Sequence, residues 1–178
     1  MLLLNRKQNA GYLVAEIGPI LWITFMFFTL PLIMLGSLGL RYSLLMSAVY
    51  STAASASQCR SFSTDTSSSE PSATTLVSQN LKQTLSTYSG ITLNRVDSYI
   101  VICPLNSSSC TKQTTPLAAP ADTSANAYNL EIVAQASINP LMIYPSKGIF
   151  GDIPGLTSPL SVQAKADSFF ENTQGLTQ

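Results

Sequence analysis

The sequence predicts an α+β protein: a long N-terminal transmembrane helix followed by a small extracytoplasmic domain, in which one amphipathic helix packs on an antiparallel sheet. Three observations carry this prediction: a long apolar run that begins at residue 12, one segment with helical periodicity, and three stretches in which apolar and polar residues alternate. A run of about 20 apolar residues is typical of a membrane span. Helical spacing predicts a helix with one apolar face, and strict alternation predicts half-buried strands.

The apolar run extends from Tyr12 to Leu40, and Glu16 is its only charged residue. These residues would form a helix of about 43 Å, which is longer than a bilayer core of about 30 Å. Pro19 and Pro31 are expected to kink this helix or to mark its edges.

The basic residues Arg6 and Lys7 precede the run, so the N-terminus is expected in the cytoplasm and the rest of the chain outside. A cleaved secretory signal is the competing interpretation, because the small residues at 54–56 resemble a cleavage site. The apolar run is longer than the roughly 7 to 15 residues of a signal core, and residues 54–56 lie well beyond its end. A permanent span is therefore the favoured interpretation.

The stem that follows, residues 41–58, contains neither proline nor glycine, so we expect the helix to continue through it. Small residues recur there at every fourth position in two stripes: Ser47, Ser51 and Ser55, and Ala48, Thr52 and Ala56. Such stripes allow packed helices to approach closely, or they belong to a stem without a partner. Residues 59–71 are poor in apolar side chains and are expected to form a linker.

The domain is expected over residues 72–178 and begins with a helix at 72–88. Ser72 is placed to cap its start and Gly90 to stop it. The residues expected on its apolar face are Val77, Leu81, Leu85 and Tyr88.

Three half-buried strands are expected at 96–103, 128–136 and 160–167, in an antiparallel sheet whose apolar face the helix at 72–88 covers. The loop before the last strand, residues 138–159, is unusually apolar. It is expected either to fold over the core or to form an interaction surface.

Composition excludes several classes of function. Nine basic residues balance nine acidic ones, which gives no indication of a nucleic-acid partner. The chain has no histidine, and no nucleophile motif or metal-ligand spacing is present. We therefore expect no enzyme activity, no cofactor, no metal and no small-molecule substrate.

The chain has three cysteines, Cys59, Cys103 and Cys110, so at most one disulfide can form within it. Cys103 and Cys110 bracket a short, serine-rich loop and are the candidate pair, provided that the compartment is oxidising. Cys59 would then remain a thiol or pair with another chain.

The start of the apolar run carries the most specific motif. A basic leader ends in Gly11, Tyr12 follows, and Glu16 stands at the fifth position of the run. This arrangement resembles the class III signal of type IV prepilins. The resemblance implies that residues 1–11 are a prepilin-type leader and that a membrane aspartic peptidase cleaves between Gly11 and Tyr12.

A buried carboxylate then has a physical purpose. After cleavage the new amine of Tyr12 is a cation at the membrane boundary, and Glu16 of a neighbouring subunit can pair with it in a low dielectric. Such a pair would fix the register of subunits in a filament. The simpler interpretation is an interfacial glutamate that the helix dipole stabilises.

The wider chain resembles the TadE-like and TadG-like minor pilins (pseudopilins) of tight-adherence, or Flp-type, pilus systems. The likeness rests on the Gly11–Glu16 start, proline within the apolar helix, the alanine-rich stem and the strand–"PL"–loop–strand ending. It implies a non-enzymatic subunit of the cytoplasmic membrane that helps to assemble, prime or decorate the filament. Such a subunit can also be incorporated into a surface pilus. The implied partners are the membrane, a prepilin peptidase, other pilin-like subunits and the assembly platform.

A second hypothesis is a permanently anchored single-pass protein with an extracytoplasmic binding domain. It predicts no cleavage and a tolerated replacement of Glu16 by alanine.

Overall fold

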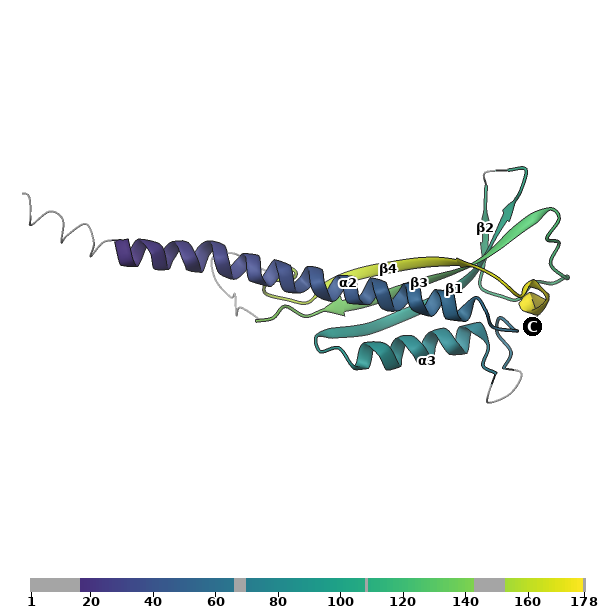
Figure 1. Cartoon of the computed structure of the whole chain (residues 1–178), viewed down its shortest axis with the longest axis horizontal. Helices are drawn as coiled ribbons and strands as arrows, with labels where there is room; N and C mark the ends of the chain where they lie inside the picture. The colour runs from purple at the N-terminus through teal and green to yellow at the C-terminus, as the bar shows by residue number, and fades with distance from the viewer. Residues whose placement is uncertain (1–16, 66–69, 108, 143–152, 178) are drawn as a thin grey trace, which may run out of the picture.

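The computed structural model describes residues 17–65, 70–107, 109–142 and 153–177. Figure 1 shows one long helix that projects from an elongated sheet domain, with the C-terminus at the far end of that domain. The described chain is therefore α+β, as the sequence predicts.

The long helix runs without a break from Ile17 to Ala56. Its first half contains a π-helical segment, η1 (Phe25–Thr29), which leads directly into α2 (Leu30–Ala56) with Pro31 in the first turn of α2. Proline lacks an N–H and therefore leaves a carbonyl of the preceding turn without its usual partner, and a π segment is one way in which a helix adapts. The predicted continuation into the stem is confirmed, and Pro31 does not end the helix.

The second helix, α3 (Ala73–Ser86), lies where its periodicity placed it. The hydroxyl of Ser72 accepts a hydrogen bond from the Thr75 amide at 3.4 Å, which caps the first turn. Its buried side chains are Ala73, Val77, Leu81 and Leu85. The chain then turns at Gly90, whose φ of +84° is a backbone conformation that favours glycine.

The sheet has four antiparallel strands in the order β2-β1-β3-β4. The three predicted strands are confirmed and longer than predicted, whereas the short edge strand β2 was not predicted. Their bounds are Ile91–Pro104 for β1, Thr111–Gln113 for β2, Asn126–Ile138 for β3 and Leu160–Phe169 for β4. The register of β1 against β3 shifts between Leu93 and Arg95.

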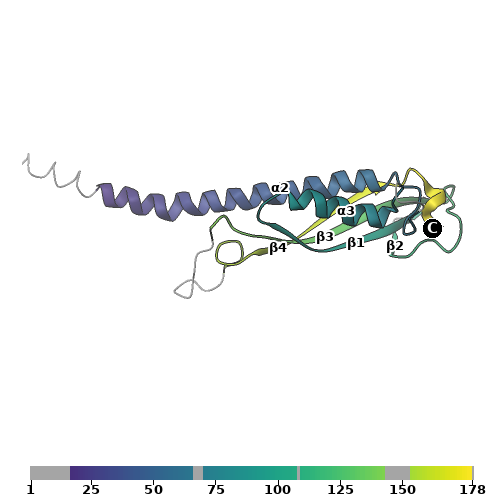
Figure 2. The same cartoon turned by 90° about the horizontal axis from the view of Figure 1, so that it is seen from below.

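Two helices, rather than the single one predicted, cover the sheet. The second half of α2 packs against β3, β4 and α3, while α3 packs against β1 (Figures 1 and 2). The stripe of Ala48, Thr52 and Ala56 is buried in this contact, whereas Ser51 and Ser55 are exposed. The stem is therefore part of the domain core, because its small side chains allow a close approach to the sheet.

The expected linker at 59–71 also needs correction. Phe62 within it is fully buried, and backbone hydrogen bonds join this segment to the start of α3 and to the C-terminal 3-10 helix η2 (Thr173–Thr177). One aromatic ring with a place in the core is enough to order a polar segment, because burying it removes a large apolar surface from water.

Candidate functional site

The projecting half of the long helix is the first candidate. The described residues contain one helix, Ile17–Ala56, that is long enough and apolar enough to cross a membrane. Only 6% of its most apolar 18-residue stretch is buried. A core helix of a water-soluble domain would be mostly buried. The residues predicted for cleavage and for subunit register, Gly11, Tyr12 and Glu16, lie outside the described residues.

The junction between the projecting half and the domain is held by Arg41, the first charged residue of the helix after residue 16. Its guanidinium donates a hydrogen bond to the carbonyl oxygen of Asn139, at the end of β3. The same guanidinium lies against Gly90, where an added Cβ would be 2.7 Å from its central carbon. The amide of Asn139 in turn donates to the Gly90 carbonyl at 2.8 Å. One side chain thus ties the helix to the α3–β1 turn and to β3.

The described flanks of the β3–β4 loop, residues 139–142 and 153–159, lie beside the same part of the helix. Gly155 approaches Leu38 so closely that an added Cβ would be 2.9 Å from its Cδ1. An open groove of about 490 Å³ lies at the junction. Its lining residues are Gly36, Ser37, Leu40, Arg41, Leu44, Thr87, Tyr88, Ser89 and Leu141.

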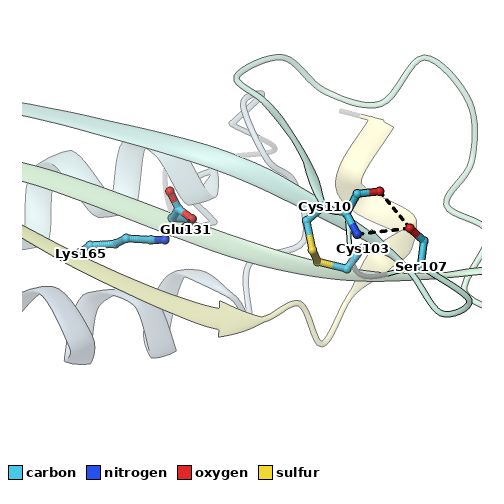
Figure 3. The surroundings of a disulfide bond; sticks show 6 residues. Cys103, Ser107, Cys110, Glu131 and Lys165 are labelled. Carbon is cyan, nitrogen blue, oxygen red and sulfur yellow. Dashed lines mark hydrogen bonds and ion pairs between the residues drawn. A yellow bond between two sulfur atoms is a disulfide. The ribbon is translucent and has the colours of Figure 1, made fainter.

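The opposite end of the domain carries the disulfide. Cys103, at the end of β1, is bonded to Cys110, and the two are seven positions apart in the sequence. This is the pair named from the sequence. Figure 3 shows the bond at the tip of the sheet, beside the turn that contains Ser107. The third cysteine, Cys59, is partly exposed, and burial raises the pKa of its thiol, which makes it a weak nucleophile at neutral pH.

Replacing Cys103 and Cys110 together by serine is expected to lower the free energy of unfolding by about 2 kcal/mol, because the bond restricts a short loop of the unfolded chain. Urea unfolding of the full chain in detergent micelles measures this change. Reduction of the wild-type chain should produce the same shift. Equal stability of the oxidised, reduced and double-serine forms would show that the loop is held by other contacts.

A charged cluster on the sheet face away from the helices is the third candidate. The Glu131 carboxylate accepts from Lys112 of β2 at 2.6 Å and from Lys165 of β4 at 2.8 Å, and only 6% of the Glu131 side chain is exposed. Burial alone would raise the pKa of Glu131, but the hydrogen bonds and charges of the two lysines outweigh it and hold the pKa below its ordinary value. The cluster links three strands and holds the short strand β2 to the sheet.

This cluster predicts a specific sensitivity to acid. A carboxylate with a depressed pKa stabilises the fold above its ordinary pKa of about 4.3, and that contribution disappears as the pH falls through the folded-state value. Glu131→Gln should therefore be less stable than the wild type at pH 7, and the difference should disappear as the pH falls through the lowered pKa of Glu131. Thermal unfolding at a series of pH values tests this. Asp65 and Asp122 also have lowered pKa values, because they accept hydrogen bonds from Ser72 and Ser124 respectively, so the variant keeps part of the acid sensitivity. A constant difference at all pH values would contradict the prediction.

Glu131 and Lys165 occupy polar positions of the strands expected at 128–136 and 160–167, but nothing in the sequence shows that they pair, and Arg41 was not expected to have a role. Arg41 could have been singled out because it is the first charged residue after the apolar run. Within the described ranges, no group of three His, Cys, Asp or Glu side chains is placed to hold a metal ion. No protein family, curated protein or solved structure matches the chain.

Proposed function

We propose that the chain is a minor pilin-like subunit, similar to TadE, that is anchored in the cytoplasmic membrane and helps to assemble, prime or decorate a tight-adherence pilus without catalysing a reaction. The observation that carries the proposal is the single uninterrupted helix from Ile17 to Ala56, whose first half is an exposed apolar rod and whose second half belongs to the domain core.

This construction suits a filament subunit better than a tethered binding domain. A flexible linker would let a domain turn freely above its anchor. Here the helix enters the core directly, and Arg41 fixes the point of entry through the Asn139 carbonyl. The position of the helix in a bundle would therefore set the position of the domain on the filament surface.

Two further features support the proposal. The motif from Gly11 to Glu16 places a carboxylate at the start of the apolar run, where it is costly without a partner. The Cys103–Cys110 disulfide lies at the end of the domain away from the projecting helix, and disulfides persist in oxidising compartments. Both agree with a cytoplasmic N-terminus and an extracytoplasmic domain.

The test is the N-terminal sequence and intact mass of the protein from native membranes, with and without the prepilin peptidase. We expect the chain to begin at Tyr12 only when the peptidase is present. Gly11→Val should block this processing, whereas Gly18→Val should not, because an added Cβ at Gly18 meets no atom within 4 Å. A chain that begins at Met1 in every strain would overturn the proposal and favour the permanently anchored binding protein.

A further inference from the structure

The described flanks of the β3–β4 loop expose apolar side chains near the membrane end of the domain. Leu141 is 55% exposed, Met142 59% and Ile153 40%. The described flanks, residues 139–142 and 153–159, contain no charged side chain. In contrast to single exposed apolar residues, which are ordinary, these three belong to one loop.

The level of this loop along the helix is fixed by contacts. Gly155 lies against Leu38, and Leu141 lines one groove together with Gly36 and Leu40. A bilayer core of about 30 Å corresponds to about 20 helical residues, so a span that begins between Tyr12 and Ile17 leaves the hydrocarbon between about Leu32 and Gly36. The loop flanks therefore lie at the outer boundary of the bilayer when the helix spans it.

The domain cannot lift this loop away from the helix without breaking the junction. The hydrogen bond from Arg41 to Asn139 holds the first residue of the loop flank against the helix. Figure 2 shows the end of β3 and the start of β4 beside the long helix, while the tip of the sheet near β2 lies far along the domain.

We propose that Leu141, Met142 and Ile153 insert into the interface of the outer leaflet and give the domain a second contact with the membrane; this rests on the anchoring proposed above. The occupant is lipid rather than a second copy of the chain, because the exposed apolar surface of the helix continues into the loop at the depth where headgroups meet acyl chains. Exposed apolar side chains are suited to that depth, and a cation such as Arg41 beside them is suited to the headgroup level. The domain would then contact the membrane surface before it enters a filament.

The test uses the full chain with Cys59→Ser, reconstituted at low protein density in phosphatidylcholine vesicles. A single cysteine is introduced by Met142→Cys and labelled with nitrobenzoxadiazole, an environment-sensitive fluorophore. The matched control is Phe169→Cys, which is also 59% exposed but stands at the far end of β4. Lipids that carry a nitroxide close to the headgroup or close to the chain end serve as quenchers of both fluorophores. Trp22, the only tryptophan of the chain, reports on insertion of the helix itself.

We expect a headgroup-proximal nitroxide to remove about half of the fluorescence at position 142 and almost none at position 169, because side chains inserted at the interface lie at headgroup depth. Quenching of Trp22 without quenching at position 142 would overturn the loop contact and leave the anchoring intact. Unquenched Trp22 would overturn both. A blue shift at position 142 that needs high protein density and is insensitive to the nitroxide lipids would assign the surface to a second copy of the chain, and so overturn the lipid contact.

Discussion

Gly175→Ala is expected to lower the free energy of unfolding by about 3 kcal/mol or more, since an added methyl group in a tight contact forces the backbone apart. A Cβ at Gly175 would overlap the backbone carbonyl of Arg60. The amide of Phe62 donates to the Gly175 carbonyl at 3.3 Å, so the two segments meet directly through their backbones. The neighbouring Leu176, which is buried, would be withdrawn from the core together with η2.

Chemical denaturation of the full chain in micelles measures this loss. Gly39→Ala is the matched control, because a Cβ at Gly39 meets no atom within 4 Å and alanine is the better helix former. The control should be as stable as the wild type or slightly more stable. If Gly175→Ala behaves like the control, the C-terminal segment does not dock on residues 60–62 in solution.

Under the proposed function, Glu16→Ala is expected to reduce the amount of this protein in sheared pilus fractions by at least about tenfold, because a carboxylate that is costly in the membrane is retained for a role that alanine cannot perform. Insertion and cleavage should persist, since the apolar helix and Gly11 remain. Under the proposed function, the loss reflects failure to pair with the amine of Tyr12 in a neighbouring subunit.

The measurement compares the membrane and filament fractions of the same cells by quantitative immunoblotting. Glu16→Asp keeps the charge on a shorter side chain and should retain part of the incorporation, and Gly18→Ala is the neutral control. Normal incorporation of Glu16→Ala would contradict the pairing with Tyr12 and support a glutamate that is only interfacial.

The fold class and the main elements could be predicted because each rests on a local pattern. Ser72 caps its helix from within the same turn, and the alternation in β3 and β4 requires no knowledge of distant residues. The short strand β2 has three residues, too few for alternation to be recognised.

Contacts between distant segments could not be predicted. Phe62 stands in a serine- and threonine-rich stretch, and nothing local reveals that the core has a place for its ring. Likewise, Glu131 reads as an ordinary polar-face residue until β2 and β4 bring Lys112 and Lys165 to either side of it. The disulfide pair was accessible because Cys103 and Cys110 are close in sequence, whereas the junction at Arg41 joins residues far apart.

The π-helical segment from Phe25 to Thr29 has a consequence for symmetry in an assembly. Each residue of an α-helix advances the side-chain direction by about 100°, and a π turn accommodates one residue more than an α turn. Side chains that precede this segment therefore point in directions that differ from those a uniform α-helix would give them, relative to the side chains of α2. Under the proposed function, the face of the helix that would contact neighbouring helices in the membrane and the face that contacts the sheet are therefore set at an angle that depends on this one turn.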